Sequence, residues 1–522
     1  MKRLKEALAH SLVLNSFRNS FLVGWIFSAP DLAVAGPYDS YHATSYLVGR
    51  SAAARDRVIA ALQALGGRVG AMVRGSWFLA RVPAVVDALA YLLLLLAAAY
   101  ALADYGFDRI GFLAGAWDEL ILLAFLGLWL IRAAAENLQV GAAMAQEQEG
   151  EGASVSGNIG DAAATASAGV GAGTQLLLPL LLFYAVVVVY FIAAPHRQQA
   201  FEELRVLLQP TLWFFVGATF IRSARQFRNL TGIFVALMLL VAAVGIYQYL
   251  VGAEMPGKWL DDAEVAVRTR AWSVMGSPNV FGSLMMFAAF VAGGHWLAEK
   301  NRLRKWVFLL SAGVFGAAMI VSFSRGAWLA LLAAAVLLAL WVDRRLIIAI
   351  VVVSLLAMVL VPGVQYRLAY MFSSDYLYSS LQAGRLDRWY TALEYWEADP
   401  ILGLGLGRFG SGVAIKYFSE AAYSVDNYFV KIAAQMGLFG FFAFGYLVIS
   451  ALRRVRYNIS RVARSSDRLL ALGLLAGLMG IIFHAVVENL LDFPAMGVYF
   501  WFFLGTLFSL PRIMWPLAGD SQ

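Results

Sequence analysis

The stretch that decides the fold is WVFLLSAGVFGAAMIVSFSRGAWLALLAAAVLLALWV, residues 306–342. It holds two apolar runs, 306–322 and 325–342, with almost no loop between them. Each run is near the length of about 20 residues that a helix needs to cross the hydrocarbon core of a bilayer. The stretch therefore predicts two membrane-spanning helices joined by a tight turn.

The whole chain has the composition of an integral membrane protein. Of its 522 residues, 61% are hydrophobic and 14% are charged, whereas about 25% of residues are charged in soluble proteins. This balance excludes a disordered chain, a coiled coil and an ordinary soluble enzyme, and the apolar stretches are longer than those of a β-barrel. Because the chain has no cysteine and only five scattered histidines, we expect no metal ion and no cofactor.

We therefore expect an all-α, polytopic membrane protein of about 12 transmembrane helices. The predicted spans are 84–103, 117–135, 174–194, 206–222, 230–251, 280–298, 306–322, 325–342, 345–362, 428–451, 468–489 and 494–511. A large loop, 363–427, precedes the last three spans, and its Tyr, Trp and Leu content indicates an ordered, functional segment.

Lys and Arg are concentrated in alternate loops, which predicts the orientation. If the N-terminus is cytoplasmic, the later cytoplasmic loops are short and basic: 223–229, 299–305, 343–344 and 452–467. The positive-inside rule then places both termini in the cytoplasm and the large loop in the periplasm. The expected segments are a basic cytoplasmic N-terminal segment (1–83), the first two spans (84–140), a flexible Gly/Ala/Ser linker (141–173), spans 3–9 (174–362), the periplasmic loop (363–427), the last three spans (428–512) and a cytoplasmic tail (513–522).

Arginines at the expected periplasmic ends of the spans are candidate anion ligands. Arg325 breaks the positive-inside trend; it either reaches outer headgroups or binds phosphate in a cavity with its planar guanidinium. Arg385 and Arg388 share one face of an expected amphipathic helix, which suits a diphosphate. An ion-pair network of Arg388 with Asp387 or Glu394 is the alternative.

Two further regions hold candidates for substrate binding. The segment GLGLGRFG, residues 403–410, carries Arg408 but lacks the Lys-Ser/Thr of a nucleotide-binding loop. It is either a tight turn with close backbone packing or part of a site. Arg270 and Asn279 lie in and at the end of the basic loop 252–279, and Asn279 before an apolar run also fits a helix N-cap.

Polar residues at four-residue spacing mark the periplasmic ends of two late spans. One stripe is Asn427, Lys431 and Gln435, and the other is His484, Glu488 and Asp492. Since both stripes lie on the same expected membrane side, Asp426, His484 and Glu488 are candidates for general acid–base catalysis, and Asn427 and Lys431 for substrate binding. Hydrogen bonding between helices is the alternative role.

Four stretches carry a resemblance to known proteins: GSPNVFGSLM (276–285), SFSRGAWLALL (322–332), AGRLDRWYTALEYWEADPILGLGLGRFG (383–410) and DNYFVKIAAQMGLFGFF (426–442). In this order, and with the last two spans, they resemble the O-antigen ligase and polymerase superfamily of bacterial envelope glycan enzymes. The resemblance covers roughly residues 210–510. It implies a fold of about a dozen membrane helices with a large periplasmic loop before the last three.

The resemblance also implies metal-independent glycosyl transfer at the periplasmic face of the bacterial inner membrane. The donor would be an oligosaccharide or polysaccharide on undecaprenyl diphosphate. The acceptor would be lipid A–core in a ligase and another lipid-linked repeat unit in a polymerase. Arg325 and Arg385 match the family arginines that hold the diphosphate. Membrane lipid is therefore an expected partner, and nucleic acid is not.

One departure favours a polymerase over a ligase. Ligases of the family commonly carry His-Asn where this chain has Asp426-Asn427, and that histidine is regarded as the base. We therefore expect an O-antigen or exopolysaccharide polymerase in which Asp426 or His484 is the base, with Glu488 able to orient His484. A transporter or flippase for lipid-linked glycans is the alternative, but charges at span ends and the lack of a repeat favour the enzyme.

Overall fold

The computed structural model describes residues 82–110, 116–131, 176–254, 269–360, 362–382, 384–418 and 424–514. The linker expected at 141–173, and most of the expected N-terminal segment and C-terminal tail, lie outside these residues. The chain divides into two compact units, residues 1–88 with 127–172 and residues 89–126 with 173–522. The described part of the first unit consists of helical residues 82–88 and 127–131, and the site lies within the second.

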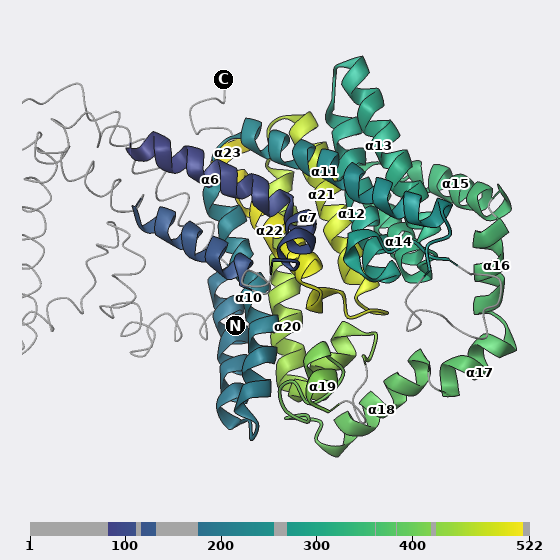
Figure 1. Cartoon of the computed structure of the whole chain (residues 1–522). Helices are drawn as coiled ribbons and strands as arrows, with labels where there is room; N and C mark the ends of the chain where they lie inside the picture. Colours follow the sequence, from purple (N-terminus) through teal and green to yellow (C-terminus); the bar gives the residue numbers. More distant parts are fainter. Residues whose placement is uncertain are drawn as a thin grey trace, which may run out of the picture. The chain divides into compact units, whose positions relative to one another are not determined.

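All regular elements in the described residues are helical, as the composition predicts (Figure 1). The named α-helices are α6 (Val82–Ala98), α7 (Tyr100–Phe107), α10 (Arg197–Phe220), α11 (Ala224–Leu250), α12 (Pro278–Ala298), α13 (Arg302–Val321), α14 (Arg325–Val342), α15 (Leu346–Leu360), α16 (Pro362–Met371), α17 (Ser374–Gln382), α18 (Arg385–Ala398), α19 (Gly412–Tyr417), α20 (Tyr428–Ser460), α21 (Ser465–His484), α22 (Pro494–Phe508) and α23 (Leu510–Met514). Short 3₁₀ helices cover Ser273–Met275 (η3) and Leu490–Asp492 (η4). Two further helices cover 117–131 and Leu176–Ala193.

Seven helices in the described part of the chain are long and apolar enough to cross a membrane. They are Leu176–Ala193, α11, α12, α13, α14, α20 and α21. Two bent pairs, α6 with α7 and α15 with α16, raise this number to nine if each pair is one span. The apolar helix α22 is shorter, at 15 residues. A multi-pass membrane protein is therefore confirmed, while the number twelve and the orientation stay predictions.

The tight turn predicted in the first stretch is confirmed, because α13 ends at Val321 and α14 begins at Arg325. Around it, α12, α14 and α21 pack side by side, and α10 packs along α22 (Figure 1). Glycines allow the close approach: a Cβ atom on Gly473 of α21 would lie only 2.7 Å from the Cα atom of Gly294 in α12. Small residues at helix crossings are typical of membrane bundles, where backbone contact replaces the hydrophobic driving force.

The glycine-rich segment 403–410 packs against a break in α20. At Gly437 the backbone adopts φ 56° and ψ −156°, and a Cβ atom there would lie 2.2 Å from the carbonyl oxygen of Ile401. The backbone N–H groups of Leu404 and Gly405 donate to the carbonyls of Ala434 and Gln435, at 2.8 and 2.9 Å. Non-helical backbone beside a membrane helix is tolerated when its polar groups are paired in this way. The segment is thus a tight turn with close backbone packing.

Candidate functional site

Four helices meet at one end of the bundle, here called the site end, around His484, the last residue of α21. The Ser283 hydroxyl of α12 pairs with Nδ1 of His484. In α14, a Cβ atom on Gly326 would lie 2.4 Å from Nε2 of His484. At the start of α20, the backbone N–H of Tyr428 donates to the carbonyl of Ala485 at 2.9 Å. The predicted site residues of these helices are therefore gathered at the same end.

Arg325 begins α14 at this end, and its guanidinium is incompletely paired. Ser324 caps the helix by accepting a bond from the N–H of Ala327, which fixes where the helix starts. The guanidinium carbon lies 4.6 Å from the ring centroid of Tyr376 and 5.8 Å from that of Tyr370. Nη1 is buried and has no hydrogen-bond partner in the described residues. A buried donor of a charged group needs an acceptor, and this atom is free to take one from a ligand.

Arg385 and Arg388 lie on α18, whose start matches the amphipathic helix that the sequence predicts. Nη1 of Arg388 lies 2.8 Å from Oδ2 of Asp426, and Nε of Arg385 lies 3.8 Å from the same oxygen. Tyr376 also lies near Arg385 and favours its charged form. Burial opposes the charge of Arg385, but the carboxylates of Asp426 and Glu488 outweigh it and raise its pKa above the usual value. Arg385 is thus held in place and charged, and Arg388 is held by its ion pair with Asp426.

Glu488 is the buried carboxylate of the site. Nη2 of Arg385 lies 3.8 Å from its Oε2, and the amide of Asn279 donates to the same oxygen. Burial first, and the nearby charge of Asp426 second, raise the pKa of Glu488 from 4.5 to about 7. Asn279 is in turn fixed by Nη2 of Arg270 at 3.0 Å. Arg270, Asn279 and Glu488 therefore form a chain of hydrogen bonds that leads to Arg385.

His484 is completely buried, and its neighbours differ from those of the two carboxylates. Its Nδ1 is paired with Ser283, and its Nε2 has no partner in the described residues and lies against Gly326. The expectation that Glu488 and Asp492 continue the stripe of His484 is wrong, since α21 ends at His484 and both lie in the connection to α22. In the structure Glu488 contacts Arg385 and Asn279.

Two further candidates have structural partners. Asn427 is the N-cap of α20 and accepts bonds from the N–H groups of Phe429 and Val430, each at 3.1 Å. Lys431 is completely buried, with Nζ 3.1 Å from Glu203 and 2.5 Å from Asp492. A buried ammonium group that lies between two carboxylates is fixed in position by its ion pairs with both. These contacts favour the alternative role, hydrogen bonding between helices.

Asn279 is not the helix cap that its position before an apolar run suggested. The N-cap of α12 is Ser277, and Pro278 occupies the first helical position, where a missing N–H costs nothing. Asn279 is therefore inside the helix, and its amide is free to link Arg270 to Glu488.

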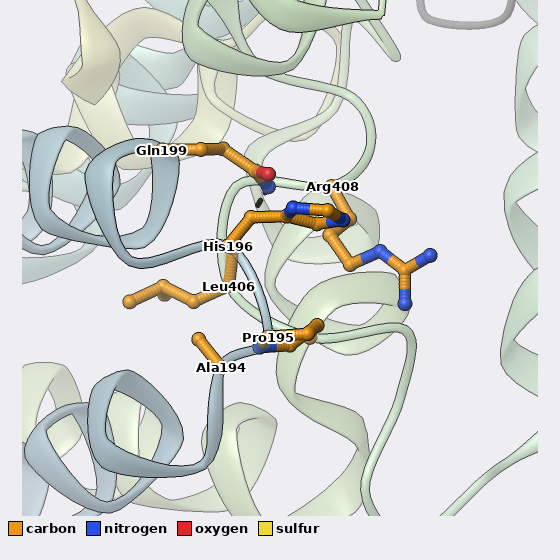
Figure 2. A pocket seen from close by; sticks show the side chains of 7 residues that line it. Ala194, Pro195, His196, Gln199, Leu406 and Arg408 are labelled. Carbon is orange, nitrogen blue, oxygen red and sulfur yellow. Dashed lines mark hydrogen bonds between the residues drawn. The ribbon is translucent and has the colours of Figure 1, made fainter.

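Arg408 lies in a different place from the other arginines. It lines a small pocket with His196 and Gln199, at the start of α10 (Figure 2). Its guanidinium is exposed, points away from these two residues, and donates to the carbonyl of Leu404 at 3.2 Å. No contact in the described residues joins it to Arg325 or Arg385, so the structure does not bring Arg408 into the site.

Backbone strain is concentrated at the site. Three described non-glycine residues have left-handed backbone: Ser273, Phe323 and Asp426, with φ between 51° and 52°. Ser273 follows Arg270 closely, Phe323 precedes Arg325, and Asp426 is itself a candidate. Such conformations are sparsely populated and cost free energy unless the surroundings hold them. Their positions support a functional role for this end of the bundle.

Three residues of the site were not found by sequence reasoning. Tyr376 contacts Arg325 and Arg385. Arg367 is buried and donates to the carbonyl of Phe323 at 2.9 Å. Asn489 accepts a bond from the N–H of Asn427, and donates to Gly410 and Ser424. Of these three residues, only Arg367 had a feature that was visible in the sequence, namely a positive charge in a loop expected to be periplasmic.

The fold defines a helical, multi-pass membrane protein with a cluster of guanidinium groups at one end of its bundle. Residues 306–445 match a family model described as O-antigen ligase. This match confirms, over these residues, the resemblance that the motifs indicate. The match includes Arg325, Arg385 and Asp426, and it ends before Glu488. A comparison with curated proteins finds no match to the chain.

Proposed function

We propose that the protein is a membrane glycosyltransferase that acts on glycans linked to undecaprenyl diphosphate at the periplasmic face of the bacterial inner membrane. The observation that carries this proposal is the pair Arg325 and Arg385, which share the contact with Tyr376. Arg325 also offers a buried donor without a partner. Guanidinium groups match the geometry of phosphate oxygens, and a diphosphate would supply the acceptor that this donor lacks.

The proposed reaction breaks the bond between the anomeric carbon of the donor sugar and the diphosphate oxygen. A hydroxyl group of the acceptor attacks that carbon, and its proton passes to a base. The lipid diphosphate leaves with the electron pair of the broken bond. Arg325 and Arg385 stabilise the negative charge that grows on it, as preorganised donors do for a developing charge in a site shielded from water.

Glu488 is the carboxylate best suited to accept the proton. A pKa of about 7 leaves both protonation states populated at neutral pH, which general base catalysis requires. Asp426 is held by Arg388 and Arg385, so we assign it to positioning these two groups. His484 is enclosed between Ser283 and Gly326, and we assign it to packing the helix ends.

Among acceptors, we favour another lipid-linked repeat unit, which makes the protein a polysaccharide polymerase. The carboxylate at position 426, where ligases commonly carry histidine, supports this choice. The test uses purified protein in lipid nanodiscs with an undecaprenyl-diphosphate oligosaccharide as the only substrate. A ladder of longer lipid-linked products is expected. Product that appears only after lipid A–core is added would make the protein a ligase, and no product with either acceptor would overturn the proposal.

A further inference from the structure

The segment after α15 begins at the site end of the bundle. α15 and α16 meet at an angle of 99° after Leu360. α16 is fixed to the turn between α13 and α14, because Arg367 donates to the carbonyl of Phe323. Gly363 also packs on the ring of Phe323, where a Cβ atom would lie 2.7 Å from a ring carbon. Since that turn is the end of two membrane spans, α16 starts at the level of a membrane surface.

The next helix, α17, has two different faces. Tyr376 and Ser380, one turn apart, face the protein: Tyr376 contacts Arg325, and the Ser380 hydroxyl accepts a bond from the N–H of Leu386 at 3.2 Å. The other face is apolar and uncovered. Leu377, Tyr378 and Leu381 have exposed fractions of 53, 67 and 45%, and Phe372 before the helix has 83%.

We propose that α17 is an interfacial helix whose apolar face, Phe372, Leu377, Tyr378 and Leu381, lies in the lipid leaflet at the site end. The occupant is lipid because α15, which α16 joins to α17, is an apolar helix that exposes Leu355 and Val359 in the same way, and such a surface faces acyl chains. Short amphipathic helices with aromatic and leucine side chains on one face bind in this zone of the bilayer.

This placement has a consequence for the substrate, which rests on the proposed function. If one face of α17 lies in the leaflet, Tyr376 on its other face holds Arg325 and Arg385 at the depth of the lipid phosphates. A lipid-linked diphosphate then reaches both guanidinium groups by lateral diffusion beside α17, without withdrawing its polyprenyl chain from the membrane. This arrangement of α17 would select substrates whose phosphates are attached to a membrane-bound lipid.

The chain has no cysteine, so single Leu377→Cys, Tyr378→Cys and Leu381→Cys variants can carry a nitroxide label without background. The polar neighbours Asp375→Cys and Gln382→Cys serve as matched controls on the same helix. In nanodiscs, electron paramagnetic resonance compares relaxation of the label by oxygen, which concentrates in lipid, with relaxation by a water-soluble nickel chelate. We expect labels at 377, 378 and 381 to respond several-fold more to oxygen than those at 375 and 382.

The proposal would be overturned if the nickel chelate relaxed the labels at all five positions to the same extent, because α17 would then lie in water. Labels at 377, 378 and 381 shielded from both reagents would also overturn it, because another protein surface would cover the face. Neither readout requires turnover, so failure of the proposed function and failure of this inference are distinguishable. For the substrate consequence, Leu381→Lys should lower transfer from an undecaprenyl donor several-fold more than transfer from a short-chain, water-soluble prenyl diphosphate donor.

Discussion

The guanidinium carbon of Arg325 lies 4.6 Å from the ring centroid of Tyr376. The same tyrosine lies near Arg385 and favours its charged form, so one aromatic side chain on a short helix adjoins the two arginines that the motifs single out. Cation–π contacts of this length stabilise a guanidinium by about 0.5–2 kcal/mol while leaving its N–H groups available. The ring of Tyr376 therefore positions Arg325 without occupying the donors that a diphosphate needs.

Substitutions of Tyr376 should distinguish the contribution of its ring to activity from that of its hydroxyl group. Tyr376→Phe keeps the ring beneath Arg325 and loses the hydroxyl group near Arg385, so we expect kcat/KM to fall by roughly three- to tenfold, as the loss of about 1 kcal/mol of polar interaction implies. Tyr376→Ala removes both contacts and should cost more. Tyr390→Phe, at an exposed position of α18, is the control. Equal activity of Tyr376→Ala and the control would contradict the positioning role.

The pH dependence of kcat/KM should report the ionisation of Glu488. A base acts when deprotonated, so kcat/KM should rise with pH through a midpoint near 7, the pKa that burial and Asp426 give to Glu488. Asp426→Asn removes a like charge, which lowers the pKa of Glu488 and moves the midpoint to lower pH while activity persists. Asp387→Asn on α18 is the control and should leave the midpoint unchanged. An inactive Asp426→Asn at every pH would instead make Asp426 the base.

Asn489 should act through Asp426. Its side chain bonds to the backbone of Asn427 and to Ser424, on either side of Asp426, at 3.1 and 3.2 Å, and Asp426 has left-handed backbone. Asn489→Ala should therefore lower kcat/KM about tenfold or more. In a double-mutant cycle, adding Asn489→Ala to Asp426→Ala should cost little further activity. Additive losses would show that Asn489 has an independent role.

The packing of α14 on α21 predicts a stability effect. A Cβ atom on Gly326 would lie 2.4 Å from Nε2 of His484 and 2.9 Å from a methyl carbon of Val487. Gly326→Ala should therefore destabilise the protein by about 1–3 kcal/mol, as overpacking does, measured as a lower Tm in nanodiscs. Gly316→Ala on α13, where nothing lies within 4 Å, is the matched control. If the Tm of Gly326→Ala equalled that of the control, α14 and α21 would be able to move apart without a loss of stability.

The helical fold and the ends of its helices could largely be predicted, because apolar run length and turn residues are local properties. The turn before Arg325 and the start of α18 at Arg385 both lie where the pattern indicates. The stripe from His484 to Glu488 was mistaken because four-residue spacing does not show where a helix stops. α21 ends at His484, ahead of Pro494 at the start of α22.

The partners within the site could not be predicted, since they depend on contacts between segments distant in the sequence. Asn279 and Glu488 are separated by 209 positions, and nothing local in either segment indicates the other. Tyr376 lies among several tyrosines of the large loop, and its role comes only from the way α17 faces Arg325. Lys431 had a visible polar spacing, but its ion pair with Glu203 joins α20 to α10, and no local pattern indicates that partner.

The central claim is that Arg325 and Arg385 bind one diphosphate, and direct binding tests it best. Native mass spectrometry of the protein with undecaprenyl diphosphate should show binding to the wild type. Binding should weaken at least tenfold in Arg325→Lys and in Arg385→Lys, because lysine keeps the charge but loses the planar fork, and charge-assisted bonds contribute about 1.5–3 kcal/mol. Arg408→Lys, outside the site, should bind as the wild type does. Wild-type affinity in both Arg325→Lys and Arg385→Lys would contradict the account.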